Sequence, residues 1–291
     1  MKRAKVNGIE LEYEVKGSGE PLLLISPVVA GAFVPFLSAP ELVDRYRVVR
    51  YHKRGWAGST HSIPPVRIAD HAADAAALLD QLGVSRAHVA GHSSGGAVAM
   101  ELAAERPDLV HTLALLEPSL FSVPSAPALF ARAAPSIEAY RGGDHEGAVA
   151  GFLSLVSGLD WETCRDAIDK HVPGGVAQAI SDADTFFGVE LPALGAWEFG
   201  PEQAAAITQP VLSVLGTETE RLWVEVADLL RSWFPHIEEL AIDGVGHLLQ
   251  MQRANPVTRG VAEFLGRHPM VSVEDSRATQ AALAPMVSIF Q

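Results

Sequence analysis

The chain has 291 residues, of which 48% are hydrophobic, and its formal net charge is −13. A chain of this length buries one large core, or a core plus an insertion, and no apolar run approaches the length that spans a bilayer. We therefore expect a globular protein without a membrane partner. The acidic balance excludes a nucleic-acid partner, because phosphate binding depends on clustered Lys and Arg.

Two features of the sequence bear on its compartment. The basic start, Met1-Lys2-Arg3-Ala4-Lys5, is followed by polar alternation and not by an apolar stretch, so no signal peptide is predicted. Cys164 is the single cysteine, which excludes an intramolecular disulfide and a cysteine-based metal cluster. We expect a cytoplasmic protein in which Cys164 is a small buried hydrophobic residue.

The first third of the chain predicts a hairpin, then strands and a helix. Asn7-Gly8 separates two alternating stretches, which is a type I′ turn signal, and the second stretch ends near Val15. Continuous apolar runs predict strands buried on both faces at 22–25, 46–51 and 87–90, with an alanine-rich helix at 68–82.

The same order continues with a helix at 96–105 and strands at 112–116, 211–215 and 237–242. A final helix is predicted to be capped by Asn255, with Pro256 at its first position and its body running to about Leu265. Segments that alternate in this way indicate an α/β fold with a mostly parallel sheet.

Two regions interrupt the alternation. Residues 118–209 hold helical stretches at 136–141, 146–156 and 161–170 but no clear strand, and they are too long for a loop, so we interpret them as an inserted helical cap. The core domain is then 1–117 and 210–268. The tail, 269–291, has a mild apolar pattern that is consistent with docking, with assembly into a homo-oligomer, or with disorder.

The segment Gly91-His92-Ser93-Ser94-Gly95 fits the nucleophile-elbow pattern Gly-x-Ser-x-Gly. A predicted strand precedes it and a predicted helix follows, so the chain must turn sharply and push one hydroxyl into an exposed position. Ser93 is therefore the candidate nucleophile. The alternative is a glycine-rich turn with an incidental serine.

Several motifs together resemble the α/β-hydrolase superfamily, over roughly residues 6–266. They are the elbow with Gly96, the segment Arg54-Gly55-Trp56-Ala57-Gly58-Ser59, the pair Gly246-His247 and the position of the cap. The resemblance implies an eight-stranded, mostly parallel sheet flanked by helices, with the cap inserted after the sixth strand. It leaves the substrate open, because this fold hosts esterases, lactonases, carbon–carbon bond hydrolases and receptors.

His247 is the candidate general base. It follows the last predicted strand and the turn Asp243-Gly244-Val245-Gly246, which places it at the carboxyl edge of the sheet, the same edge as the elbow. A serine hydroxyl is a weak nucleophile unless a base with a pKa near 6.5 removes its proton. His92 beside the nucleophile is expected to project to the other side of the turn.

The third triad member departs from the commonest family pattern. Most relatives have an aspartate about three residues past the glycine that ends the seventh strand, and here that position is Thr219. Threonine cannot supply the charge that holds the imidazole in the right tautomer. Glu218 and Glu220 flank this position and are alternative acids.

Glu117 is the preferred acid. It ends the strand next to the elbow strand, and its segment resembles that of some haloalkane dehalogenases and of zearalenone lactonases, which carry a glutamate acid there. Asp243 is a further alternative, and a solvated strand-end carboxylate is the non-functional interpretation of Glu117.

Two backbone amides are expected to bind the developing oxyanion. One belongs to Ser94, the residue after the nucleophile, and the other, by position, to Val28. Relatives usually have a His-Gly pair where this chain has Ser26-Pro27, and Pro27 has no N–H to donate.

The cap is expected to supply most of the substrate pocket, and its apolar character implies an apolar substrate moiety. Most of the aromatic and apolar cap residues are expected to form the core of the cap: Phe121, Leu129, Phe130, Trp161, Phe186, Phe187, Leu191, Trp197 and Phe199. The sequence has no metal cluster, phosphate-binding loop or nicotinamide fingerprint, so no cofactor is predicted. We expect a serine hydrolase that cleaves carboxylic esters or lactones through an acyl-enzyme, with a Ser-His-Glu triad. The alternatives are a carbon–carbon bond hydrolase acting on a β-diketone-like substrate and a non-enzymatic ligand-binding protein.

Overall fold

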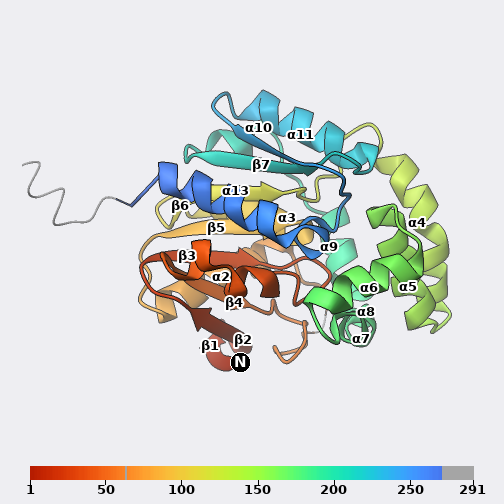
Figure 1. The fold of residues 1–291 in the computed structure, drawn as a ribbon. Coiled ribbons are helices and arrows are strands. Elements are labelled where there is room, and N and C mark those ends of the chain that lie inside the picture. The colour runs from red at the N-terminus through yellow and green to blue at the C-terminus, as the bar shows by residue number, and fades with distance from the viewer. Residues whose placement is uncertain (63, 271–291) are drawn as a thin grey trace, which may run out of the picture.

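A computed structural model of the chain describes residues 1–62 and 64–270, and within them an eight-stranded sheet forms the centre of the molecule (Figure 1). The strand order is β1-β2-β4-β3-β5-β6-β7-β8. Strand β2 runs antiparallel to both of its neighbours, and all other pairs are parallel. The strands are β1 (Lys2–Val6), β2 (Ile9–Lys16), β3 (Glu20–Ile25), β4 (Tyr46–Tyr51), β5 (Ala87–His92), β6 (Val110–Leu116), β7 (Val211–Gly216) and β8 (Glu238–Ile242). The predicted fold, a mostly parallel sheet flanked by helices, is confirmed.

The hairpin at the start of the sheet follows from its turn residues. Asn7 and Gly8 join β1 to β2 with φ angles of 47° and 79°. A type I′ turn needs positive φ at both central positions, which Asn and Gly adopt at the least cost.

The central strands are buried on both faces, as their continuous apolar runs predict. Leu23 and Ile25 of β3 pack in one core cluster with α2 (Ile68–Gln81), α3 (Ser94–Glu105) and α11 (Arg221–Trp233). Leu22 and Leu24 pack on the opposite face with the helical turn η1 (Val34–Ser38), α1 (Pro40–Val43) and α13 (Ala254–Arg267). Because side chains along a strand alternate between faces, one apolar run serves both helical layers.

A series of helices lies between β6 and β7, and we call these the insertion helices. Those from α4 to α8 gather at one end of the sheet (Figure 1). A third core cluster joins them to loops of the sheet, through residues such as Trp56 and Leu248. The insertion helices are α4 (Ala126–Arg141), α5 (His145–Ser157), α6 (Trp161–His171), α7 (Gly175–Ser181), α8 (Ala183–Thr185), η2 (Phe186–Glu190), α9 (Leu191–Gly195) and α10 (Pro201–Ala205).

The start of the last helix differs from the prediction. Asn255 is not its cap, because α13 begins at Ala254 and the capping position is Arg253. The short helix α12 (Leu249–Gln252) ends directly before it, so Asn255 and Pro256 fall inside the first turn. Proline is tolerated there because the first four amides of a helix have no partner within the helix.

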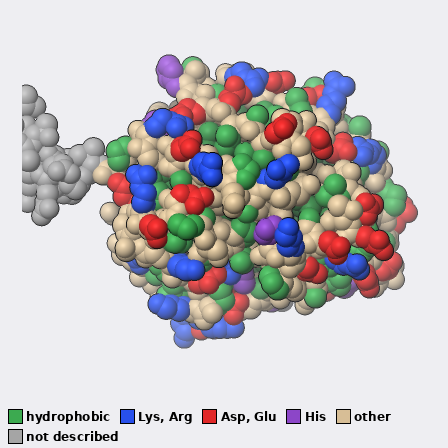
Figure 2. Space-filling model, viewed as in Figure 1, with side chains coloured by type: hydrophobic (Ala, Val, Ile, Leu, Met, Phe, Trp, Pro, Cys, Tyr) green, Lys and Arg blue, Asp and Glu red, His purple; other side chains and the backbone are tan. Residues whose placement is uncertain are grey.

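Three further points concern the surface charge, membrane-spanning helices and the tail. Acidic and basic side chains are interspersed on the face seen in Figure 2. No helix in residues 1–62 and 64–270 is long and apolar enough to cross a membrane. The expectation for the tail falls almost wholly on residues 271–291, which lie outside the described residues.

Candidate active site

Ser93 occupies a strained turn between β5 and α3. Its φ and ψ are 54° and −121°, a conformation that L-residues rarely adopt. The turn is held by backbone hydrogen bonds on both sides, since the Ser93 amide donates to the Leu116 carbonyl at 3.0 Å and the Ser119 amide donates to the Ser93 carbonyl at 2.9 Å. The strained turn is thus held by the end of the neighbouring strand β6 and by the loop after it.

The glycines of the elbow allow the close packing that this turn needs. A β-carbon at Gly95 would collide with the Ile25 carbonyl oxygen, and one at Gly91 would lie 2.8 Å from the Ala99 β-carbon. Helix α3 therefore packs directly on β3 and β5, which carries Ser93 to the carboxyl edge of the sheet.

His247 and Glu117 form a buried pair at this edge. Glu117 follows β6 with a φ of 43°, and His247 lies in the loop after β8. The Nδ1 atom of His247 is 2.7 Å from Oε2 of Glu117, and the side chains are 6% and 0% exposed. When Glu117 is ionised, its carboxylate only accepts hydrogen bonds, so Nδ1 carries the proton and Nε2 is left as an acceptor.

Two further donors reach the Glu117 carboxylate. The Gly216 amide donates to Oε1 at 2.8 Å, and the Thr219 hydroxyl donates to Oε2 at 2.9 Å. Burial raises the pKa of Glu117 to about 7, although these two hydrogen bonds oppose the rise because they stabilise the charged form. Burial lowers the pKa of His247, so the imidazole is neutral at pH 7.

The alternative acids lie elsewhere. Glu220 pairs with Arg132, at distances of 2.9 and 3.0 Å. Asp243 accepts from the Thr217 hydroxyl at 3.3 Å. Among the hydrogen bonds of the described residues, neither these carboxylates nor Glu218 contacts the His247 ring.

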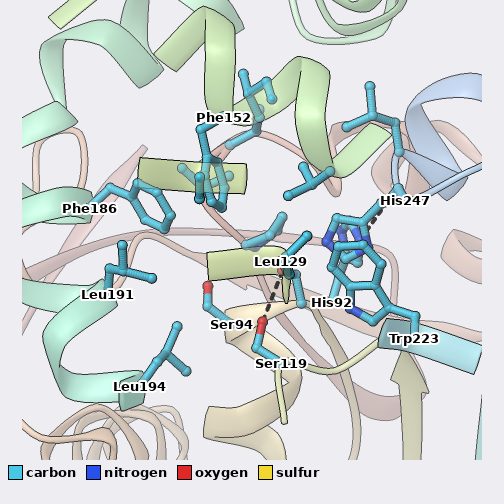
Figure 3. Close-up of a pocket in the computed structure, with 18 of the residues that line it drawn as sticks. His92, Ser94, Ser119, Leu129, Phe152, Phe186, Leu191, Leu194, Trp223 and His247 are labelled. Atoms are coloured by element: carbon cyan, nitrogen blue, oxygen red, sulfur yellow. Dashed lines mark hydrogen bonds between the residues drawn. The ribbon is translucent and has the colours of Figure 1, made fainter. Parts of the chain in front are cut away.

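Two neighbours fix the orientation of His247. The Trp223 indole of α11 stacks on the imidazole with ring centroids 3.6 Å apart and planes 19° apart (Figure 3). The His92 ring lies 4.8 Å from the His247 ring between centroids, and its Nε2 donates to the His247 carbonyl at 2.9 Å. Gln250 donates to His92 Nδ1 at 3.0 Å. Burial lowers the pKa of His92 to about 3, so its ring stays neutral. Through its two ring nitrogens it links the His247 carbonyl to the Gln250 side chain.

The Ser93 hydroxyl lies 3.2 Å from the hydroxyl of Ser119. Among the described residues, no hydrogen bond joins Ser93 to His247 in this conformation. Hydrogen bonds of this kind are often unformed in ligand-free enzymes and tighten when substrate binds.

The two predicted oxyanion donors both border the cavity that contains Ser93. Ser94 is the first residue of α3, where an amide has no partner within the helix. Val28 follows Pro27 in the loop after β3, and both residues line the same cavity.

The cavity above Ser93 is narrow and apolar. Its volume is about 40 Å³, which is room for a few water molecules. None of its described lining residues is Asp, Glu, Lys or Arg. Figure 3 shows Phe186, Leu191 and Leu194 across the cavity from His247 and Trp223. The insertion supplies much of the wall through Phe121, Leu129, Phe130, Phe152, Phe186 and Leu191.

Four of the nine aromatic and apolar residues named for the cap do not line this cavity: Trp161, Phe187, Trp197 and Phe199. Trp197 instead donates to Glu101 at 2.9 Å, and Phe187 stacks on Tyr140 at 5.2 Å. Phe187 thus packs within the insertion, and Trp197 packs against α3. The sequence shows that these residues are apolar but not which neighbour each one meets.

Sequence reasoning missed several residues of the site: Ser119, Phe152, Thr219 as a hydrogen-bond donor, and Trp223. The position of Thr219 was a usable signal, since it stands where relatives carry an acid and its hydroxyl contacts the acid used instead. Nothing in the local sequence marks Trp223 as the ring that stacks on His247.

The remaining points concern the single cysteine and metal binding. Cys164 is buried, as expected, and burial raises the pKa of its thiol to about 11, so it stays protonated at neutral pH. In residues 1–62 and 64–270, no group of three or more His, Cys, Asp or Glu is arranged to hold a metal ion.

The chain belongs to the alpha/beta hydrolase fold family, whose profile matches residues 22–254. A putative carbamate hydrolase, RutD of Azorhizobium caulinodans, is 38% identical over 107 residues, which are 37% of this chain and 40% of that relative. The matches to this and other carbamate hydrolases of the same name span less than half of the relatives' length.

Solved structures resemble nearly the whole chain. A thermophilic esterase from Thermogutta terrifontis has a TM-score of 0.76 at 20% identity and covers 92% of this chain and 100% of its own. Est816, described as an N-acyl homoserine lactone degrading enzyme, has a TM-score of 0.68 at 25% identity and covers 90% and 100%.

Proposed function

We propose that the protein is a serine hydrolase that cleaves carboxylic esters or lactones of uncharged, apolar small molecules. The observation that carries this proposal is the juxtaposition of a strained elbow serine, Ser93, with a buried His247–Glu117 pair at one apolar cavity. Strain and burial of this kind are maintained against a cost in stability, which favours a catalytic role over a structural one.

In the first half of the reaction, Ser93 attacks the substrate carbonyl. Rotation about its Cα–Cβ bond brings Oγ from Ser119 toward His247 Nε2, which accepts the hydroxyl proton as the bond to carbon forms. The Ser94 and Val28 amides bind the resulting oxyanion. The tetrahedral intermediate collapses, and the leaving alkoxide takes the proton from Nε2, which leaves an acyl-enzyme.

In the second half, water replaces the leaving group. His247 Nε2 accepts a proton from the water as its oxygen attacks the acyl carbon, and it returns that proton to Ser93 Oγ when the acid departs. Throughout, Glu117 holds the imidazole through Nδ1 and stabilises the transient imidazolium. The Trp223 ring adds an aromatic face for that cation.

The cavity lining favours an uncharged substrate. With no Asp, Glu, Lys or Arg among its described lining residues, it offers no counter-ion to a carboxylate or an ammonium group. Ser93, Ser94 and Ser119 line it, and so few hydroxyl-bearing side chains match a substrate whose polar atoms are confined to the scissile group. The names of an esterase and a lactone-degrading enzyme among the structural relatives support the same reaction class.

The test combines turnover with covalent labelling. Ser93→Ala should lower ester turnover by at least about three orders of magnitude while the protein folds normally. A fluorophosphonate should add once to the wild-type protein, at Ser93, as read by intact-mass and peptide mass spectrometry. Ser119→Ala is the matched control and should still be labelled at Ser93.

Labelling at Ser94, or no labelling, would contradict the nucleophile. A substrate panel of p-nitrophenyl esters, aromatic lactones, an aryl carbamate and a β-diketone then decides the reaction class by product analysis. Faster cleavage of the diketone than of any ester or lactone would reverse the ranking in favour of carbon–carbon bond hydrolysis.

A further inference from the structure

A buried ion pair joins the insertion to the sheet domain directly behind the elbow. Lys53 lies in the loop after β4, and Glu190 ends η2. Their Nζ and Oε2 atoms are 2.6 Å apart, and each side chain is 1% exposed. The Trp56 indole donates to the same Glu190 oxygen at 2.8 Å.

The same ammonium also contacts the elbow. Lys53 Nζ donates to the Ser94 hydroxyl at 3.2 Å. Lys53 is not among the residues that line the cavity, whereas Ser94 is. Of the residues that Lys53 contacts (Ser94, Glu190 and Trp56), Ser94 is the one that lines the cavity, and its amide is a proposed oxyanion donor.

Stability alone gives no reason for this pair. Removing two charges from water is expensive, and apolar residues of similar size in place of a buried ion pair often leave stability unchanged or raise it. Burial would raise the pKa of Glu190, but the charge of Lys53, the nearby His71 and hydrogen bonds from Lys53 and Ser94 together outweigh this effect and hold the pKa below its usual value. Burial also lowers the pKa of Lys53, and the charge and hydrogen bond of Glu190 oppose that shift. Glu190 is therefore ionised at neutral pH, and Lys53 has a fixed counter-charge.

We propose that Lys53 is a positioning residue that, anchored by Glu190 of the insertion, holds the Ser94 hydroxyl and so aligns the Ser94 amide with the oxyanion. This inference rests on the proposed function. Its consequence is that one contact of the insertion, the ion pair made by Glu190, is coupled to the alignment of the catalytic amide, although every proposed catalytic group lies outside the insertion.

Other contacts at the same junction provide a control. The Thr185 hydroxyl of α8 donates to the Gly55 carbonyl at 2.6 Å, and the Ala57 amide donates to Asp182 at 3.2 Å. These hydrogen bonds seat the insertion on the loop after β4 without touching Ser94. Thr185→Val thus loosens the junction and leaves the Lys53–Ser94 contact in place.

The experiment uses the full chain and compares four variants with the wild type. Lys53→Met/Glu190→Met removes both charges together and leaves no lone buried charge. Ser94→Ala removes the hydroxyl but keeps the amide. The triple variant combines these changes, and Thr185→Val is the control. The readouts are kcat and KM on a p-nitrophenyl ester, the Kd of phenylboronic acid, which forms a tetrahedral adduct with a catalytic serine, and the thermal unfolding midpoint.

We expect the double variant to lose about 10-fold in kcat and a similar factor in boronic acid affinity, with KM changed less than about 2-fold, because a displaced donor is felt most in the transition state. Ser94→Ala should show the same pattern, and the triple variant should be no worse than Ser94→Ala, since the charges act through that hydroxyl. Thr185→Val should keep the wild-type kcat.

Wild-type kcat and boronic acid affinity in the double variant would overturn the proposal, as would an equal loss in Thr185→Val or additive losses in the triple variant. Should the double variant fail to fold, Ser94→Ala decides, because wild-type kcat there also overturns it. Fluorophosphonate labelling of the wild type distinguishes a failure of this inference from a failure of the proposed function. A labelled wild type with an unaffected double variant refutes only the role of Lys53, whereas an unlabelled, inactive wild type refutes the proposed function and this inference with it.

Discussion

Glu117 and Thr219 meet beside His247, where the Thr219 hydroxyl donates a hydrogen bond to the Glu117 carboxylate. The carboxylate comes from the end of β6, and the threonine comes from the loop after β7, where relatives place an aspartate. Strands β6 and β7 are neighbours, so the two loops converge on the same side of His247. Thr219 therefore donates a hydrogen bond to the proposed acid, Glu117.

This arrangement predicts a strong effect of Glu117→Gln. We expect kcat to fall by roughly 10²–10⁴ with the fold retained, because the imidazole loses its orienting charge. Thr219→Val should cost less, about 10-fold, since two of the three donors to the carboxylate remain. Steady-state kinetics on a p-nitrophenyl ester and circular dichroism measure both effects.

Glu218→Gln and Glu220→Gln are the controls, because their carboxylates make no contact with His247 among the described hydrogen bonds. Near-wild-type kcat in these two variants is expected. A large loss in either of them, with little loss in Glu117→Gln, would move the acid to the loop after β7.

At the scale of elements, the insertion helices set the shape of the cavity. Phe152 of α5 faces Phe186 at the start of η2, with ring centroids 4.7 Å apart, and both rings line the cavity. The cavity of about 40 Å³ is smaller than most small-molecule sites, so the size of these side chains limits what reaches Ser93.

Phe152→Ala should therefore enlarge the acyl site. We expect the ratio of kcat/KM for a long-chain to a short-chain p-nitrophenyl ester to rise at least about 5-fold. Removing the ring relieves the steric exclusion of the long acyl chain and removes apolar contacts with the short one. The rate of fluorophosphonate labelling should change by less, since no proposed catalytic group moves.

Trp161→Ala is the matched control for this prediction. Trp161 lies in the neighbouring helix α6 and does not line the cavity, so its removal should leave the chain-length ratio unchanged. An equal shift in both variants would mean that any loosening of the insertion, and not the wall at Phe152, changes selectivity.

At the scale of the whole molecule, buried neutral histidines limit stability in acid. His71 of α2 is 1% exposed, and neither of its ring nitrogens has a hydrogen-bond partner among the described residues. Burial is the main reason that its pKa is lowered to about 4. Burial also lowers the pKa of His92 to about 3. An unfolded histidine titrates near 6.5, so between that pH and about 4 the unfolded chain binds a proton that the folded His71 does not.

The free energy of unfolding should therefore fall as pH drops below 6.5, by about 1.4 kcal/mol per pH unit for each such histidine. His71→Leu should remove about 2 kcal/mol of the loss between pH 7 and pH 5. Urea unfolding at the two pH values measures this, with the exposed His236→Asn as control. An unchanged pH dependence in His71→Leu would show that His71 is protonated in the folded state.

Much of this molecule is encoded locally. The runs of apolar residues predict the central strands, Asn7-Gly8 predicts the hairpin, and the elbow motif places Ser93 between β5 and α3, because each depends on the conformational preferences of a few neighbouring residues. The order of elements then brings His247 and Glu117 to the carboxyl edge, since parallel strands end on the same side. The start of α13 was misplaced because its cap depends on how α12 ends and not on the Asn-Pro signal itself.

Tertiary structure alone decided the contacts that orient and enclose the site. Glu117 and Thr219 are 102 positions apart, and 41 positions separate Lys53 from Ser94. Trp223 stacks on His247, and Phe152 enters the cavity while Trp161 does not. Each of these depends on the rotation of one element against another and on the direction of single side chains. Such contacts are set by packing across the whole chain. A hydrophobic pattern shows that one face of an element is buried, but not which residue of another element it meets.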